Sequence, residues 1–454
     1  MKLFYCFFLC LASVIAVSQE NFLIVKKIQI NGNDVTKEKI VRRELLFSEG
    51  DTVFQENLAE KIRYSKYNLQ NTRLFNFVNI NYEIEENNAV NVEVNLTERW
   101  YIWPIPLLEY AEPNLTTFLR NRDFSRIDYG GYLIHENFRG RREVLKAIVR
   151  QGFDKQYALE YTLPYVNPKK TLGLYFRAGY NFNHTVTVTT EKNQRVFYSE
   201  ANTYTRKQPY FTTQITLRHK YFAYHTIGLH IHRYITSDSL NIQYPDFLKS
   251  ANGKQEYKGI NYAFYYNRLD WVVFPLKGYY FFNYLNYAFL SGTTLFSSTH
   301  AVSFYQSFGE RWFMALQSKV MKNWLNAPPY YLMSALGYKD NLRGFDNYII
   351  DGTDFFLLKT DIKYQWLKVS EKKLPGINNE KFSKYFLYGF AAPFFDVGYV
   401  YWKNPGNNFL QNHIQYSTGM EFSFVTYYNI VMQFDAAYLS TREFAWAIRV
   451  QRVF

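Results

Sequence analysis

Cysteine is almost absent from this sequence. Its 454 residues include two, Cys6 and Cys10, and both lie close to the N-terminus. The same stretch has a basic start, an apolar run and a small-residue ending at Ala16 and Ser18, which is the plan of a secretory signal peptide. A single membrane anchor is the alternative, but the run is short for one. We predict a signal peptide over residues 1–18 and a mature chain without disulfides, thiol nucleophiles or thiolate metal ligands.

Long hydrophobic runs are also absent beyond this leader, which argues against membrane-spanning helices. Aromatic residues are nevertheless abundant, with 42 Tyr and 41 Phe, while the mean hydropathy is −0.31. Disordered chains are poor in aromatics, and a large soluble β-sandwich would have to bury many aromatic faces without the help of disulfides. A transmembrane β-barrel combines these features, because its strands alternate apolar and polar residues.

Alternation is clear in the region from residue 99 to 454. In TLGLYFRAGYNF the even-numbered residues are apolar, whereas Arg177 falls on the other face. This pattern is typical of a strand with lipid on one side and a lumen on the other. We predict about sixteen such strands, an even number as bacterial barrels require, with long extracellular loops at 185–209 and 237–255. The predicted strands begin near Trp100, Asp128, Glu143, Gln156, Thr171, Phe211, Ala223, Glu256, Gly278, Thr299, Trp312, Asp354, Phe386, Ile414, Ile430 and Glu443.

The segment from residue 19 to 98 has fewer aromatics and more Lys, Glu and Asn. FLIVKKIQINGN alternates as a strand, TKEKIVRREL and QENLAEKIRYSKYNLQNTRLF have helical patterns, and NFVNINYEIEE and AVNVEVNLTER form a strand hairpin. Thr36 is the predicted N-cap of the first helix. This order of elements resembles a POTRA domain. The resemblance implies a periplasmic domain that holds substrates or partners at an exposed sheet edge, and a rigid spacer or plug is the alternative.

Several short motifs after residue 99 resemble those of the BamA/TamA superfamily of outer-membrane proteins, and they occur in the superfamily's order. NFRGRREVLKAIVRQG and YTLPYVNP are similar to its early strands, and QYSTGMEFSFV to part of its penultimate hairpin. NRLDWVVFPLKGYYF is similar to its mid-barrel motif at Asp270, Pro275 and Gly278. We therefore expect a mainly β fold: a 16-stranded antiparallel transmembrane β-barrel preceded by one small α+β (βααββ) POTRA domain.

Two further motifs of that superfamily belong to a sixth loop and to a later strand. LGYKDNLRGF is similar to the loop motif V/I-R-G-F/Y, with leucine in place of the β-branched residue. Its four matching positions are Leu342, Arg343, Gly344 and Phe345. FFDVGYV is similar to the strand motif F-x-D-x-G. Its three matching positions are Phe394, Asp396 and Gly398.

The alternation of PFFDVGYVYW places Asp396 on the lumen face and Phe395 on the lipid face. A confined carboxylate needs a partner, and the planar guanidinium of Arg343 can donate two parallel hydrogen bonds to it. We predict that loop six folds into the barrel and that Arg343 pairs with Asp396, with Gly344 allowing close approach and Phe345 packing against the wall. The residues alone favour an exposed loop cation and a hydrated lumen carboxylate over the pair, whereas the resemblance favours the pair.

The two ends of the predicted barrel carry separate signals. The last strand, EFAWAIRVQRVF, ends on Phe454, a terminal aromatic residue that resembles the insertion signal of bacterial outer-membrane proteins. The predicted first strand contains Pro104 and Pro106, each of which removes a ladder donor. These prolines indicate a weak seam between the first and last strands, although prolines also mark the starts of strands.

The remaining features of the sequence do not point to catalysis. The formal charge is +13, but the basic residues are spread thinly and form no nucleic-acid module. His230 and His232 lie on one face of a strand without a third metal ligand at a suitable spacing. Nucleophile-elbow, P-loop and dinucleotide-binding motifs are absent. We predict no enzyme activity, no cofactor, no metal and no nucleic-acid partner.

The resemblance to the BamA/TamA superfamily implies a role in the bacterial outer membrane. We expect an assembly, insertion or translocation factor that uses a periplasmic POTRA domain for substrate or partner binding and a lateral barrel seam. The expected partners are outer-membrane lipids, unfolded outer-membrane or secreted protein clients, and periplasmic or lipoprotein partners. The alternative is a dedicated secretion pore or transporter for one partner protein or for lipid.

Overall fold

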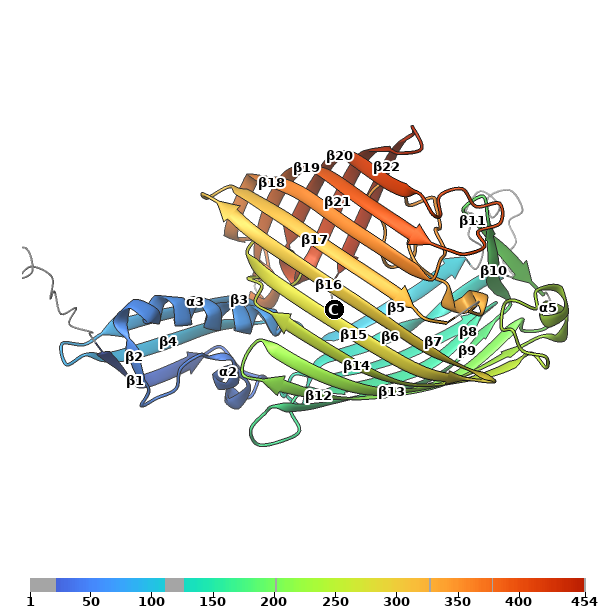
Figure 1. Ribbon diagram of the computed structural model, residues 1–454. Coiled ribbons are helices and arrows are strands. Elements are labelled where there is room, and N and C mark those ends of the chain that lie inside the picture. The colour runs from blue at the N-terminus through green and yellow to red at the C-terminus, as the bar shows by residue number, and fades with distance from the viewer. Residues whose placement is uncertain (1–21, 111–125, 201, 326–327, 378, 453–454) are drawn as a thin grey trace, which may run out of the picture.

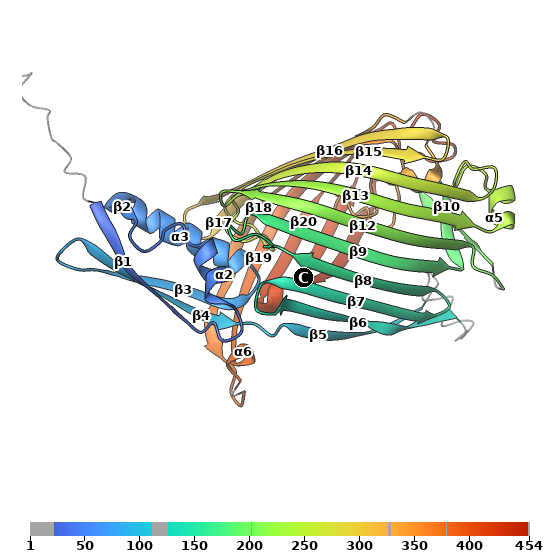
Figure 2. The same cartoon turned by 90° about the horizontal axis from the view of Figure 1, so that it is seen from below.

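The computed structural model describes residues 22–110, 126–200, 202–325, 328–377 and 379–452. Over these ranges the chain forms a small α+β domain and a large sheet that curls into a barrel (Figure 1; Figure 2). The predicted signal peptide lies outside the described residues. No helix in the described ranges is long and apolar enough to cross a membrane.

The small domain is a four-stranded sheet covered by two helices. Its elements are β1 (Phe22–Asn31), α2 (Glu38–Glu44), β2 (Thr52–Phe54), α3 (Gln55–Asn71), β3 (Phe75–Ile84) and β4 (Ala89–Glu98). The sheet order is β2-β1-β4-β3, with β1 parallel to β4. Buried Leu58, Ile62 and Leu69 lie on one face of α3 and pack on the sheet. The predicted order of elements is confirmed, with the short β2 in addition.

The first helix begins later than predicted. α2 starts at Glu38, and no side chain caps it. Thr36 is buried instead, with its hydroxyl in contact with Tyr101 and with the side-chain amide of Asn137. Its backbone N–H donates to Glu98. The predicted N-cap at Thr36 is therefore wrong, because this threonine joins the small domain to the barrel.

Within the described chain, sixteen strands form one antiparallel sheet, as predicted. Each strand pairs with its neighbour in the chain, apart from a separate hairpin after β9. The strands are β5 (Ile102–Tyr110), β6 (Ile127–Phe138), β7 (Glu143–Gly152), β8 (Lys155–Leu163), β9 (Leu172–Asn183), β12 (Arg206–His219), β13 (Ala223–Thr236), β14 (Lys254–Asn267), β15 (Gly278–Leu290), β16 (Thr293–Phe308), β17 (Trp312–Asn323), β18 (Asp354–Lys373), β19 (Lys384–Tyr401), β20 (Ile414–Thr426), β21 (Ile430–Leu439) and β22 (Phe444–Arg452).

Side chains along these strands alternate between the outer surface and the lumen. On β19, Phe395 is 47% exposed and the next residue, Asp396, is 0% exposed. The alternation arises because successive residues of a strand point to opposite faces of the sheet. The predicted assignment of these two residues to lipid and lumen faces agrees with their exposure.

The two long predicted loops contain further structure. β10 (Thr185–Glu191) and β11 (Gln194–Ser199) form a separate hairpin, and α5 (Asp238–Gln243) lies in the second loop. β12 begins at Arg206, before the predicted Phe211, because Pro209 is accommodated within the strand rather than ending a loop. β16 begins before the predicted Thr299, since its start is rich in Ser and Thr and lacks a clear apolar face. The remaining short helices are η2 (Tyr330–Leu332), α6 (Glu380–Ser383) and η3 (Tyr427–Asn429).

Candidate functional site

Loop six, the segment between β17 and β18, folds into the barrel lumen. Its apolar residues Leu336, Leu342 and Phe345 are fully buried. They pack in one cluster with lumen-facing side chains of β18, β19 and β21, which include Phe355, Leu357, Phe394, Val400, Ala437 and Leu439. The insertion of loop six is therefore observed as predicted, and burial of these apolar side chains stabilises it.

Arg343 pairs with Asp396, also as predicted. Its Nη2 lies 2.5 Å from Asp396 Oδ1, and its Nε and backbone N each lie 3.0 Å from Asp396 Oδ2. Both residues are buried. The guanidinium carbon also lies 4.1 Å from the centre of the Phe394 ring, a cation–π contact. Paired charge-assisted hydrogen bonds of this kind fix the orientation of the side chain as well as its distance.

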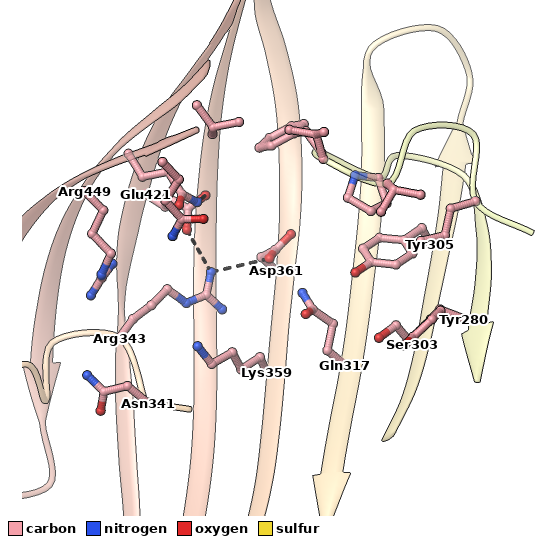
Figure 3. Close-up of a pocket in the computed structure, with 18 of the residues that line it drawn as sticks. Tyr280, Ser303, Tyr305, Gln317, Asn341, Arg343, Lys359, Asp361, Glu421 and Arg449 are labelled. Atoms are coloured by element: carbon pink, nitrogen blue, oxygen red, sulfur yellow. Dashed lines mark hydrogen bonds and ion pairs between the residues drawn. The ribbon is translucent and has the colours of Figure 1, made fainter. Parts of the chain in front are cut away.

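Two further carboxylates, which the sequence did not predict, complete this arrangement. Arg343 Nη1 lies 3.4 Å from Asp361 Oδ2 on β18 and 3.3 Å from Glu421 Oε2 on β20 (Figure 3). Asp361 forms a second ion pair with Lys363. Three adjacent strands thus each present one carboxylate to a single guanidinium. We call Arg343, Asp361, Asp396 and Glu421 the latch.

Glycine is required at two positions beside the latch. Gly344 has a φ of +88°, and a Cβ there would lie 2.7 Å from both Ala437 Cβ and Leu439 Cδ2. A Cβ on Gly398 would lie 2.7 Å from Leu342 Cδ1. Both distances are shorter than van der Waals contact, so any side chain would displace the loop. Leu342 occupies the space over Gly398.

Loop six also contacts the last two strands of the barrel. Asp346 forms an ion pair with Arg449 on β22 at 2.8 Å, and Arg449 also pairs with Asp435 on β21. The Tyr348 hydroxyl donates to Glu443, just before β22, at 2.7 Å. Together with the latch and the apolar cluster, these contacts join loop six to every strand from β18 to β22. We call these strands the C-terminal wall.

A cavity of about 950 Å³ lies in the lumen beside the latch. Figure 3 shows Arg343, Lys359 and Glu421 on one side of it and Gln317 and Tyr305 farther along the wall. Cationic, anionic and uncharged polar side chains are mixed in its lining. This lining differs from the mainly apolar pockets that bind small organic ligands, and it suits a hydrated lumen.

The first and last strands of the barrel are not joined by a ladder in the described residues. β5 pairs with β6 and β22 pairs with β21, but no pairing connects β5 to β22. Each strand therefore has one edge of backbone N–H and C=O groups without a strand partner. Side chains on the outer face of β22 are highly exposed beside this free edge, with Phe444 87% exposed and Trp446 80% exposed. We call the gap between these two edges the seam.

The small domain and the overall fold are both similar to known proteins. Residues 23–99 match the POTRA family model, described as the surface antigen variable number repeat. BamA from Haemophilus ducreyi lacking POTRA domains 1-3 is similar over 94% of this chain and 85% of that chain, with a TM-score of 0.51 and 15% identity. CdiB from Escherichia coli is similar over 94% of this chain and 76% of that chain, with a TM-score of 0.53 and 11% identity. In fold and domain order, a POTRA domain followed by a β-barrel, the chain is similar to both of these proteins. No curated protein sequence matches it.

The predicted mid-barrel motif forms the turn between β14 and β15. Asp270 Oδ1 accepts the backbone N–H of Leu276 at 3.1 Å and so closes the turn. Gly278 has a φ of +105°, and a Cβ there would lie 2.1 Å from the carbonyl oxygen of Arg268. Pro275 borders the lumen cavity. Asp270 and Gly278 therefore shape this turn, and Pro275 lies within it.

This turn contacts the POTRA domain. The side chain of Asn71, the last residue of α3, donates to the carbonyl of Leu269 at 3.2 Å and accepts the N–H of Val272 at 3.0 Å. The side-chain amide of Asn71 thus satisfies one backbone C=O and one backbone N–H group of the irregular turn. The mid-barrel motif therefore presents a docking surface for the POTRA domain.

α2 of the POTRA domain lies at the same end of the barrel (Figure 2). A buried ion pair fastens it there. Glu44 accepts hydrogen bonds from Arg218 Nη1 and Nη2 and from the Tyr165 hydroxyl, each at 2.6 Å, and Arg142 lies 4.0 Å away. We call these four residues the clamp. Burial alone would raise the pKa of Glu44, but Arg218, with its charge and its hydrogen bonds, outweighs burial and holds that pKa at about 2. Sequence reasoning did not predict the clamp.

The other residues considered from the sequence are Phe454 and two histidines. Phe454 is outside the described residues. His230 contacts Thr212 Oγ1 at 3.2 Å through Nδ1 and Asn261 Oδ1 at 2.5 Å through Nε2, so both ring nitrogens have protein partners. His232 stacks on the His230 ring. The described part of the chain contains no group of three side chains suited to hold a metal ion.

Proposed function

We propose that the protein inserts or translocates protein clients at the bacterial outer membrane. The seam is the observation that carries this proposal: over the described ranges, β5 and β22 have no ladder between them in an otherwise continuous sheet. A free strand edge binds an extended segment through main-chain hydrogen bonds. Within lipid, the backbone N–H and C=O groups of a strand can form hydrogen bonds only with protein. Pairing with a free strand edge therefore stabilises a client strand more in the membrane than it would in water.

The outer surface of the barrel supports a membrane location with lipids as partners. Large apolar side chains are exposed on strand after strand, whereas soluble monomers confine them to patches of limited area. Examples from five different strands are Leu133, Ile227, Phe281, Ile362 and Ile448. An outer face of this kind is typical of a transmembrane barrel.

In this proposal the latch and the clamp hold the parts of the molecule around the seam in fixed positions. The latch holds the C-terminal wall from the lumen side, so the wall keeps its shape although β22 has only one strand neighbour. The clamp holds the POTRA domain at one end of the barrel. In this proposal the POTRA domain lies in the periplasm and receives clients or partner proteins, by strand addition at its own sheet edges.

A disulfide across the seam tests the proposal. The mature chain is predicted to contain no cysteine, so a variant with Leu108→Cys on β5 and a second cysteine scanned from Phe444 to Val450 on β22 has no competing thiols. We expect the oxidised variant to stop inserting a reporter barrel into phospholipid vesicles, and reductant to restore insertion. Single-cysteine variants under the same oxidation are the control. Full insertion by the cross-linked form would contradict a seam that works by opening.

Depletion of the protein in its own cells distinguishes general insertion from a dedicated pathway. General insertion predicts that many outer-membrane barrels decrease together in the membrane fraction. Loss of one secreted product or of one lipid, with other barrels unchanged, would instead indicate a dedicated secretion pore or transporter. Quantitative proteomics and lipid analysis of the outer membrane make the measurement.

A further inference from the structure

The two edges of the seam differ in their backbone donors. In an antiparallel pair, alternate residues exchange hydrogen bonds with the neighbouring strand, and the residues between them turn their N–H and C=O groups to the other side. On β5, the bond from Glu136 N to Tyr101 O, at 2.8 Å, shows together with the register that odd-numbered residues bond to β6. The even-numbered residues of β5 therefore direct their backbone groups at the seam.

Two of these even-numbered residues are prolines. Pro104 and Pro106 keep their register opposite β6, and their rings are exposed on the outer face. A proline has no N–H, so the ladder to β6 loses nothing while the seam edge loses two neighbouring donors. In the segment from Ile102 to Leu108, the only backbone N–H donors that face the seam are those of Ile102 and Leu108, at its two ends.

The opposite edge, on β22, keeps its donors. The bond from Leu439 N to Glu443 O, at 2.9 Å, places the odd-numbered residues of β22 in the ladder with β21. Its even-numbered residues face the seam, and none is a proline: Phe444, Trp446, Ile448, Val450 and Arg452. The first four of these carry apolar side chains that are more than half exposed on the outer face.

β22 is also held in place from the lumen. Arg449 bonds to Asp346 of loop six at 2.8 Å, and Glu443 accepts from Tyr348 at 2.7 Å. These contacts fix the strand before any partner arrives. An edge that is already ordered loses less conformational freedom on binding than a mobile one.

We infer that β22, and not β5, is the edge on which an incoming strand is assembled. The inference rests on the proposed function, and the occupant is a transmembrane strand of a protein client with apolar residues at every second position. Such a strand would bond to the seam-facing backbone of β22 and place its apolar side chains beside Trp446 and Ile448. Pro104 and Pro106 keep the β5 edge from competing, both for the client and for closure onto β22.

Single cysteines show which edge receives the strand. Ile448→Cys on β22 and Leu108→Cys on β5 are matched, because both residues occupy seam-facing positions and are exposed on the outer face. The probe is an unfolded eight-stranded outer-membrane protein with one cysteine scanned along its last strand, added to each variant in phospholipid vesicles. We expect disulfides to Ile448→Cys at every second probe position, at roughly tenfold the yield found with Leu108→Cys, since the β5 edge lacks two hydrogen bonds.

Exchanging prolines between the edges gives a second measurement. Ile448→Pro removes one seam-facing donor from β22 and leaves its ladder with β21 intact, and Ile102→Pro does the same on β5. We expect Ile448→Pro to slow probe insertion severalfold and Ile102→Pro to leave the rate unchanged. Restoring donors with Pro104→Val and Pro106→Val should shift disulfides towards Leu108→Cys. Heat-modifiable gel mobility shows that each variant is folded.

The outcomes separate the inference from the proposed function. Disulfides concentrated at Leu108→Cys would overturn the choice of edge while leaving insertion at the seam intact. Disulfides at neither position, with both variants folded in the vesicles, would contradict the proposed function and the inference with it. Disulfides between two copies at Ile448→Cys would make a second copy the occupant and overturn the assignment of a client strand.

Discussion

The latch and the clamp are both buried ion-pair clusters, but their charges are arranged in opposite ways. In the latch one cation, Arg343, faces three carboxylates from three strands. In the clamp one carboxylate, Glu44, faces two guanidiniums and a phenol. In each cluster a single central charge holds together groups that would otherwise repel or remain unpaired. Removing that central group leaves all of its partners without their shared counter-charge.

The clusters also differ in what they join. The latch connects a loop to strands of the same barrel, so its loss affects the stability of the barrel itself. The clamp connects two domains, so its loss affects how the POTRA domain docks while each domain keeps its own core. Mutations at the two centres should consequently change different measurements.

The largest effect is expected for Arg343→Met. This change leaves the buried carboxylates of Asp396, Asp361 and Glu421 without their shared cation. Breaking a buried pair from one side typically costs about 3–5 kcal/mol. We expect a loss of this size in the free energy of unfolding, measured by denaturant titration of the barrel in detergent micelles.

A double-mutant cycle sharpens this prediction. Asp396→Ala should destabilise the barrel similarly to Arg343→Ala, and the double variant should lose little more than either single variant, because both changes remove one interaction. Asp361→Ala and Glu421→Ala should each cost less, since their contacts to Arg343 Nη1 are longer. Additive losses for Arg343 and Asp396 would show that they act independently.

A smaller effect, confined to domain docking, is expected for Glu44→Gln. The amide keeps the shape of the side chain but leaves Arg218 buried without a counter-charge. The docking free energy should fall by about 3 kcal/mol, given a pKa held at about 2 rather than 4.5. The distance distribution between spin labels on Glu86 of the POTRA domain and Glu310 of the barrel should broaden, while barrel unfolding stays the same.

The matched control for this change is Glu85→Gln in the same domain. Glu85 pairs with Lys26 at 2.9 Å, but the side chains are 35% and 57% exposed to water, respectively. Exposed pairs contribute little, so the label distances should not change. A broadened distribution for Glu85→Gln, or a lower barrel stability for Glu44→Gln, would show that the clamp is not specific to docking.

The clamp should also respond to acid. Because docking lowers the pKa of Glu44 from 4.5 to about 2, the docked form binds fewer protons than the free form. Docking is therefore at full strength above about pH 5.5 and weakens as the pH falls through 4.5 towards 2, by up to about 3 kcal/mol. The same pair of spin labels, measured along a pH titration, checks this. Glu44→Gln should remove this part of the pH dependence.

The two clusters also show how far sequence reasoning reaches. Asp396 and Arg343 were predictable, because alternation assigns the carboxylate to the lumen and both residues lie in motifs of the superfamily. Asp361 and Glu421 also lie on lumen faces, but only the register of three neighbouring strands shows that they converge on Arg343. The number of strands and the two faces of each strand follow from local alternation. The convergence of these side chains on Arg343 depends in addition on the stagger of the strands and on the insertion of loop six.

The clamp could not be predicted in the same way. Glu44 and Arg218 are 174 residues apart, in different domains. Their meeting depends on the angle at which the POTRA domain docks, and no local pattern encodes that angle. One signal was present, since Glu44 follows the apolar Ile40 and Val41 in α2 and becomes buried with them. A carboxylate on the buried side of a short helix indicates an unseen cation.

The smallest effect is expected for Lys319→Met, which breaks another ion pair of loop six. Lys319 on β17 contacts Asp340 at 2.7 Å, about the separation found in the latch, but the side chains are 25% and 24% exposed. Water then screens the attraction, and such pairs contribute about 0–1 kcal/mol. The same denaturant titration should therefore show less than a third of the loss caused by Arg343→Met. A comparable loss would mean that loop insertion as a whole, rather than burial of the central charge, sets the strength of the latch.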